Sequence, residues 1–147
     1  MWKGGISPKR RKYILAPIVP INSCNPLDAA WLAGIMEGEG SFCFLKNGKR
    51  KSGVIKIQIG MTDRDVIDRV AKLMENAPVY NLRIRPDRKP AYLVAKTGYA
   101  AERIMIFLRP MMGERRKSQI DESLSKWQSR KTRRPEWSRL ILDEKNI

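Results

Sequence analysis

Two glutamates, Glu37 and Glu39, stand among three glycines in the segment 31–40 and are the residues best suited to chemistry in this sequence. Carboxylate oxygens are hard ligands that suit Mg²⁺, and a bound divalent cation activates water and polarises phosphates. The chain has no histidine, and its two cysteines are Cys24 and Cys43. Histidine-based triads and zinc sites built from histidine and cysteine are therefore excluded. Any catalysis must use carboxylates, cationic side chains, water and a hard metal.

Gly34 and Gly38 lie four residues apart, which places them on one face of a predicted helix. Glycine inside a helix costs about 1 kcal/mol relative to alanine, so two such positions need a reason. A face without side chains lets another backbone approach closely. We therefore expect a close helix contact with the two carboxylates at its end. The alternative is an ordinary tight contact within one chain.

The charge of the chain points to a polyanionic partner. Lysine and arginine number 30 against 15 acidic residues, which gives a net charge of +15. Nucleic acid is the first candidate and an anionic membrane surface the second. No segment approaches the roughly 18 apolar residues that cross a bilayer, and the early prolines Pro17 and Pro20 argue against a signal peptide. We expect a protein of a reducing interior that is not secreted: cytoplasmic, organellar or inside a phage host.

The 147 residues, 42% of them hydrophobic, predict one domain over residues 25–131. Residues 1–24 predict a basic arm, either disordered or lying along phosphates, and residues 132–147 a basic C-terminal extension. Asn25 followed by Pro26 predicts a helix start, and this helix should run to about Gly38.

Alternating apolar residues predict two pairs of strands. Residues 41–45 and 54–59 form the first pair around a basic turn, and residues 79–85 and 91–96 form the second. In the second pair we expect Leu82 and Ile84 to point inward. Helices are expected near 63–74, 99–109 and 114–131. This order predicts an α+β domain with an antiparallel sheet and helices on one face.

The segment from Leu32 to Gly40 resembles the signature motif of the LAGLIDADG homing endonucleases. Glu37 and Glu39 stand where the motif has aspartates, and the looser resemblance runs from about Asn25 to Trp127. It implies an αββαββα fold whose curved sheet is a DNA-binding saddle. One motif per chain implies a homodimer that cuts both strands of double-stranded DNA across the minor groove. The implied target is pseudo-palindromic, and the implied cofactor is Mg²⁺.

The resemblance also implies roles for individual residues. Glu39 matches the metal-binding, catalytic position. A basic catalytic residue is implied near Arg115, Arg116 and Lys117, and Arg115 is our first choice. Arg115 could equally be a solvated residue on a helix face. The helix contact between copies would use Ala33, Gly34, Glu37 and Gly38. Glu37 matches the first acidic position of the motif, where we expect a structural role at the helix end and no metal. The sequence departs from the family near Gly60 and Met61, where many members carry a polar side chain, and Gln58 or Thr62 would have to substitute for it.

The predicted DNA-binding residues are side chains on the outer face of the sheet and cations at its turns. Arginine suits guanine and glutamine suits adenine, while cations at turns hold phosphates. The sheet residues are Ser41, Cys43, Leu45, Lys56, Gln58, Asn81, Arg83 and Arg85; the cations are Lys49, Arg50, Lys51, Arg88, Lys89 and Lys117.

Two other functions fit the sequence less fully. One is a catalytically weak or inactive protein of the same fold that binds DNA or RNA, such as an RNA maturase or a regulator. The other is a small basic structural protein, such as a ribosomal component, which explains the charge but not the arrangement of Gly34, Gly38 and Glu39.

Overall fold

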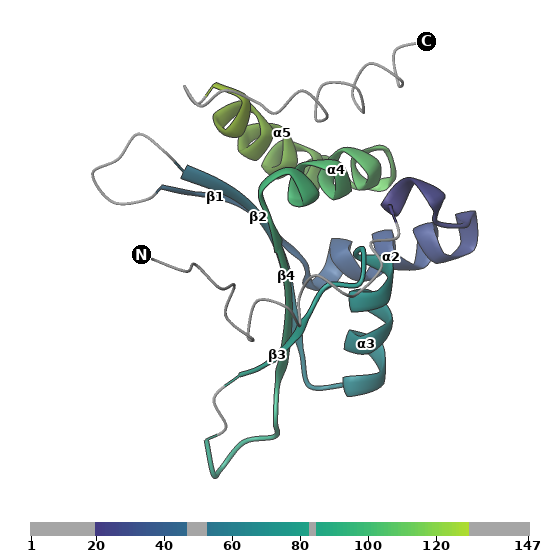
Figure 1. Cartoon of the computed structure of the whole chain (residues 1–147), viewed down its shortest axis with the longest axis vertical. Coiled ribbons are helices and arrows are strands. Elements are labelled where there is room, and N and C mark those ends of the chain that lie inside the picture. The colour runs from purple at the N-terminus through teal and green to yellow at the C-terminus, as the bar shows by residue number, and fades with distance from the viewer. Residues whose placement is uncertain (1–19, 47–52, 83–84, 130–147) are drawn as a thin grey trace, which may run out of the picture.

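The computed structural model describes residues 20–46, 53–82 and 85–129. Four antiparallel strands form one sheet in the order β1-β2-β4-β3, and the α-helices lie together on one side of it (Figure 1). The strands are β1 (Ser41–Lys46), β2 (Gly53–Met61), β3 (Val79–Asn81) and β4 (Tyr92–Thr97). The helices are η1 (Ile21–Ser23), α2 (Pro26–Glu39), α3 (Arg64–Leu73), α4 (Gly98–Leu108), η2 (Arg109–Met111) and α5 (Glu114–Ser129).

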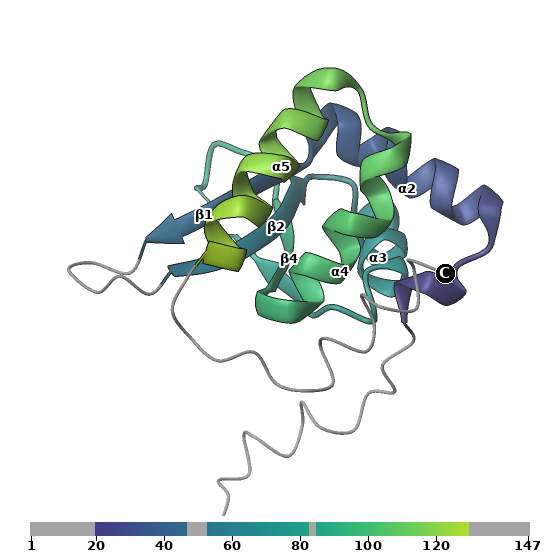
Figure 2. The same cartoon turned by 90° about the horizontal axis from the view of Figure 1, so that it is seen from above.

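This architecture confirms the predicted α+β fold. Strand β2 is central, and its residues Ile55, Ile57 and Ile59 are at most 1% exposed beneath the helices. Seen from above in Figure 2, α5 crosses over β1 and β2, while α4 lies beside it. Fully burying one such side chain contributes about 1.5–3 kcal/mol, so this layer accounts for much of the stability of the domain. Among the described residues, no helix is long and apolar enough to span a bilayer.

The first turn of α2 is stabilised by the predicted cap. The side chain of Asn25 accepts a hydrogen bond of 2.9 Å from the backbone amide of Asp28. The Asp28 carboxylate accepts a second bond, at 3.0 Å, from Arg69 of α3, and this bond lowers the pKa of Asp28. The Arg69 guanidinium also lies 3.9 Å from the centre of the Trp31 ring. Helices α2 and α3 are thus joined near the beginning of α2.

The prediction that Leu82 points inward is wrong. Directly opposed residues in an antiparallel pair share a face, and Val79 opposes Val94, a fully buried residue of β4. Val79 and Asn81 of β3 therefore lie on the helix side of the sheet, where Val79 is half-buried and Asn81 is exposed, while Leu82 is 39% exposed on the opposite side. Apolar residues occupy both alternations in this segment, so its pattern did not determine which set faces the core.

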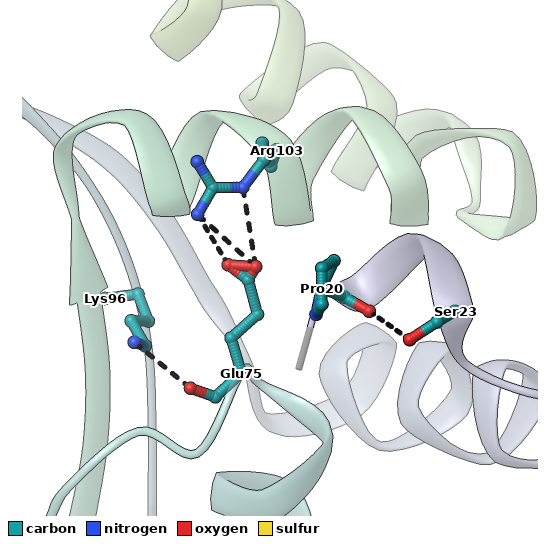
Figure 3. Close-up of polar contacts among 5 residues, drawn as sticks. All are labelled: Pro20, Ser23, Glu75, Lys96 and Arg103. Atoms are coloured by element: carbon teal, nitrogen blue, oxygen red, sulfur yellow. Dashed lines mark hydrogen bonds and ion pairs between the residues drawn. The ribbon is translucent and has the colours of Figure 1, made fainter. Parts of the chain in front are cut away.

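A buried ion pair holds the end of α3 against α4 (Figure 3). Glu75 is 1% exposed, and its carboxylate accepts a bond of 2.7 Å from Arg103. Lys96 of β4 points to the same turn and donates to the Glu75 carbonyl at 3.5 Å. Burial lowers the pKa of the Lys96 ammonium group. Glu75 also has a positive φ of 58°, an unusual conformation that this ion pair helps to hold.

Candidate active site and nucleic-acid interface

Glu39 is the last residue of α2 and is exposed at the point where the helix meets β1. The next residue, Gly40, donates its amide to the Met36 carbonyl at 3.0 Å. A Cβ at Gly40 would lie 2.6 Å from that carbonyl oxygen, so glycine is required there. The strand then begins at Ser41. The backbone on both sides of Glu39 is therefore fixed, and its carboxylate is left accessible to solvent.

The face that carries Gly34 and Gly38 is open. Both glycines are exposed, and a Cβ built on either would meet no atom of the described residues within 4 Å. The alternative of a tight contact within one chain is therefore wrong for these two positions as far as the described part of the chain is concerned. Leu27, in the first turn of the same helix, is 84% exposed. Helix α2 thus has a smooth surface that ends beside Glu39.

Two residues that we assigned to a contact between copies are used within the chain instead. Ala33 is 4% exposed and belongs to the hydrophobic core, because it lies on the inner side of α2. The carboxylate of Glu37 turns back and accepts a hydrogen bond of 3.0 Å from the amide of Gly113. The assignment of Ala33 is corrected, because it packs inward. Glu37 joins α2 to the segment before α5, which agrees with the structural role at the helix end that we expected for it.

The basic residue that reaches the end of α2 is Arg116. It is 6% exposed, and its Nε donates to the Glu37 carbonyl at 2.9 Å. Our preferred residue, Arg115, is exposed at the start of α5, and Lys117 makes an ion pair of 3.5 Å with Glu114. Sequence reasoning considered Arg116 only as one of three neighbouring cations. The position of a buried residue on an amphipathic α5 was the signal that could have singled it out.

One chain does not supply a complete metal site among its described residues. No group of three or more histidine, cysteine, aspartate or glutamate side chains gathers there around a possible ion. Glu39 provides a single accessible carboxylate, of the hard oxygen type that Mg²⁺ prefers. This donor type fits the implied cofactor.

The predicted polar residues of the first hairpin do share the sheet face opposite the helices. Ser41 opposes Gln58 and Cys43 opposes Lys56, while the buried isoleucines of β2 take the other face. These four side chains are half-buried, and Leu45, at the far end of β1, is 46% exposed. Gln58 of β2 lies opposite Ser41, and Ser41 follows Glu39 by two residues in the chain. The amide side chain of Gln58 is therefore on this face, at the end of the sheet near Glu39. We call this surface, formed by the outward residues of β1 to β4, the outer face.

The other end of the outer face is apolar, which sequence reasoning missed. Tyr80 opposes Leu93 on this face and is 47% exposed. A Cβ at Gly60 would lie 3.7 Å from Leu93 Cδ1 and 3.9 Å from Leu82 Cδ1, which brings these side chains together. The assignment of Asn81 to the outer face is corrected, since Asn81 opposes Tyr92 and so belongs to the helix side of the sheet.

The remaining predicted cations are only partly covered by the structure. Arg85, Arg88 and Lys89 are exposed at the turn between β3 and β4, where the Arg88 amide donates to the Arg85 carbonyl at 3.0 Å. Lys49, Arg50, Lys51 and Arg83 lie outside the described residues, as do residues 1–19 of the predicted arm and the whole extension 132–147.

No protein-family model matches this sequence, and no curated protein matches it significantly. Solved structures do match. The homing endonuclease I-CvuI, in complex with its target, superposes with a TM-score of 0.53 at 18% identity, over 67% of this chain and 64% of that one. The archaeal intron-encoded homing endonuclease I-Vdi141I, complexed with DNA, gives 0.53 at 14% identity, over 64% and 63%.

A third structure is matched over nearly all of this chain. The LAGLIDADG homing endonuclease I-SmaMI, bound to cleaved DNA, gives a TM-score of 0.50 at 20% identity, over 98% of this chain and 47% of that one. This chain thus spans 64% of the length of I-CvuI and about half of I-SmaMI. These similarities confirm the predicted fold.

Proposed function

We propose that this chain, which has the fold of the LAGLIDADG homing endonucleases, is a site-specific DNA endonuclease that acts as a metal-dependent homodimer. The observation that carries the proposal is the position of Glu39, which is accessible at the end of the open glycine face of α2. One geometry accounts for both features: two copies of α2 in close contact, with two carboxylates side by side. An ordinary helix of the core needs neither feature.

The open face of α2 supports a second copy. The exposed glycines allow a close approach of two helices across a twofold axis, because no side chain separates their backbones. Leu27, at the beginning of the same helix, adds an apolar side chain that a partner would cover.

The outer face supports DNA as the substrate. This face carries the polar side chains of Lys56 and Gln58 and the apolar side chains of Tyr80 and Leu82. The chain as a whole has a net charge of +15. Lysine and glutamine can hydrogen-bond to base edges in the major groove, and apolar side chains can contact thymine methyl groups. The exposed cations at the turn between β3 and β4 are suited to phosphates, which would position the sheet on the duplex.

Glu39 of each copy would hold the metal. Two carboxylates brought together repel each other unless a cation lies between them, so the contact itself favours binding of a divalent ion. Such an ion supplies a water molecule activated for attack and an electrophile for the phosphate. The chain's own contribution is to hold the Glu39 carboxylates at fixed positions over the duplex, through Gly40 and the end of α2.

One observation favours a second function, a binding protein that does not cleave. Gly60 has no side chain and Met61 is apolar, so the end of β2 offers no polar group to orient a water molecule. Gln58, on the outer face opposite Ser41, is the nearest substitute on that strand. In this second function the same face would bind DNA or RNA, and Glu39 would be dispensable.

The test is cleavage of a library of long DNA molecules in the presence of Mg²⁺, with the cut sites read by sequencing. We expect one discrete site, cut on both strands. Glu39→Gln should abolish the cut and leave DNA binding intact, while Glu122→Gln, which removes an exposed carboxylate on α5, should cut normally. Normal cutting by Glu39→Gln would contradict the assigned role. Tight RNA binding without any DNA cleavage would favour the second function.

A further inference from the structure

We propose that Arg116 is a positioning residue: it holds the C-terminal turn of α2 and thereby fixes the metal-binding Glu39. This inference deepens the proposed function and rests on it. Arg116 lies in the first turn of α5, far from α2 in sequence. The contact with Glu37 that identified it is one of several, and together they surround the guanidinium group.

The guanidinium group of Arg116 is directed at the backbone immediately before Glu39. Its Nε donates to the Glu37 carbonyl at 2.9 Å, and one terminal nitrogen donates to the Gly38 carbonyl at 3.5 Å. Its other terminal nitrogen donates to the side-chain oxygen of Gln119 at 3.0 Å. The group also lies 5.7 Å from the centre of the Phe42 ring on β1. Arg116 therefore contacts the helix before Glu39 and the strand after it.

Two physical needs are met by this arrangement. The last carbonyl groups of a helix have no partner within it, and they form the negative end of its dipole. Helix α2 has no basic residue in its last turn, so the positive charge comes from α5 instead. A buried arginine in turn needs acceptors for its donors, and the two carbonyls and Gln119 provide them.

Glu39 follows directly from the two carbonyls that Arg116 holds, and Gly40 after it is bonded to Met36. The Glu37 carboxylate adds a third connection through the Gly113 amide. Without Arg116, the last turn of α2 would lose its charged partner and open more often. Metal ligands must be held within about 0.5 Å, so even modest opening would weaken the binding of a cation shared by two copies.

A purely structural cap would stabilise the chain without affecting the metal, and the experiment must separate the two roles. Arg116→Met removes the charge and the hydrogen bonds, while Arg116→Lys keeps the charge but loses the fork of donors. Arg103→Met is the matched control, because it removes another arginine that pairs with a buried partner, Glu75, between α4 and the turn after α3.

The first readout is hydrogen exchange at the Gly40 amide in the full chain without metal or DNA. We expect exchange to be faster by about tenfold in Arg116→Met, because local opening exposes this amide. Arg116→Lys should show a smaller increase and Arg103→Met none at this position. Equal exchange in Arg116→Met and the parent chain would overturn the proposal. If Arg116→Met does not fold, Arg116→Lys decides alone, and no increase there overturns it.

The second readout is cleavage as a function of Mg²⁺ concentration at saturating DNA. For both Arg116 variants we expect a higher concentration for half-maximal rate and an unchanged Kd for DNA measured without metal. Arg103→Met should keep the metal dependence of the parent. A uniform loss of DNA binding with unchanged metal dependence would overturn the proposal. If the parent chain cuts no DNA, the proposed function fails, and the exchange of Gly40 still shows whether Arg116 holds this turn.

Discussion

The Gly113 amide and the Glu37 carboxylate, 76 positions apart in the sequence, meet in a hydrogen bond of 3.0 Å. This contact joins the end of α2 to the segment that leads into α5. A Cβ at Gly113 would lie 3.0 Å from Glu37 Oε1, a close approach that a shift of a few tenths of an ångström in this flexible side chain relieves. The relationship yields the first of four predictions.

Glu37→Ala should destabilise the chain by about 1 kcal/mol, because a charge-assisted hydrogen bond to a half-buried carboxylate is lost. Urea unfolding followed by circular dichroism measures this. Since the contact is within one chain, the loss should be the same at every protein concentration. A loss that appears only at high concentration would instead restore Glu37 to the contact between copies.

Gly34→Leu should weaken self-association, because the side chain would separate two α2 helices that otherwise approach closely. No described residue of the same chain obstructs it, since none has an atom within 4 Å of a Cβ at this position. Replacing the glycine should even stabilise the monomer, by up to about 1 kcal/mol. Sedimentation velocity gives the oligomeric state and thermal unfolding gives the stability.

The control for Gly34→Leu is Ser118→Leu, which adds the same side chain at an exposed position of α5. It should leave association unchanged. If Gly34→Leu sediments as the parent chain does, then α2 does not form the contact between copies.

Tyr80→Ala should weaken DNA binding by about 1–2 kcal/mol, because this half-exposed ring would be covered by the duplex. Its neighbour Asn81 is the matched control: it opposes Tyr92 on the helix side, so Asn81→Ala should bind as the parent does. Fluorescence anisotropy at a fixed salt concentration measures both. A larger loss of DNA affinity in Asn81→Ala than in Tyr80→Ala would show that DNA does not lie on the outer face.

Lys96→Met should stabilise the chain at neutral pH. Burial lowers the pKa of Lys96, so the unfolded chain binds this proton more tightly than the folded one. The charged lysine therefore costs stability below its folded pKa, and this cost decreases as the pH rises through that value. Glu75 keeps Arg103 as its partner in the variant.

The measurement for Lys96→Met is the difference in free energy of unfolding from the parent chain between pH 7 and pH 11. We expect an advantage for methionine at pH 7 that shrinks as the pH rises. An advantage that grows with pH would mean that the ammonium group stabilises this part of the fold.

Much of the site could be predicted from short stretches of sequence. The cap at Asn25, the helix from Pro26 and the alternation of Ile55, Ile57 and Ile59 depend on local rules, and all are found in the structure. The same holds for the shared face of Gly34 and Gly38, since residues four apart lie on one side of a helix whatever surrounds them. That this face is open was decided by the tertiary structure.

Other features depended on tertiary contacts. The sequence has apolar residues on both alternations of β3, so only the pairing with β4 decided that Val79 turns inward while Leu82 turns outward. Three adjacent cations lie in the first turn of α5, and only packing against the end of α2 distinguished Arg116 from Arg115. Periodicity and caps act between residues a few positions apart, whereas strand register and burial of a charge depend on partners distant in the chain.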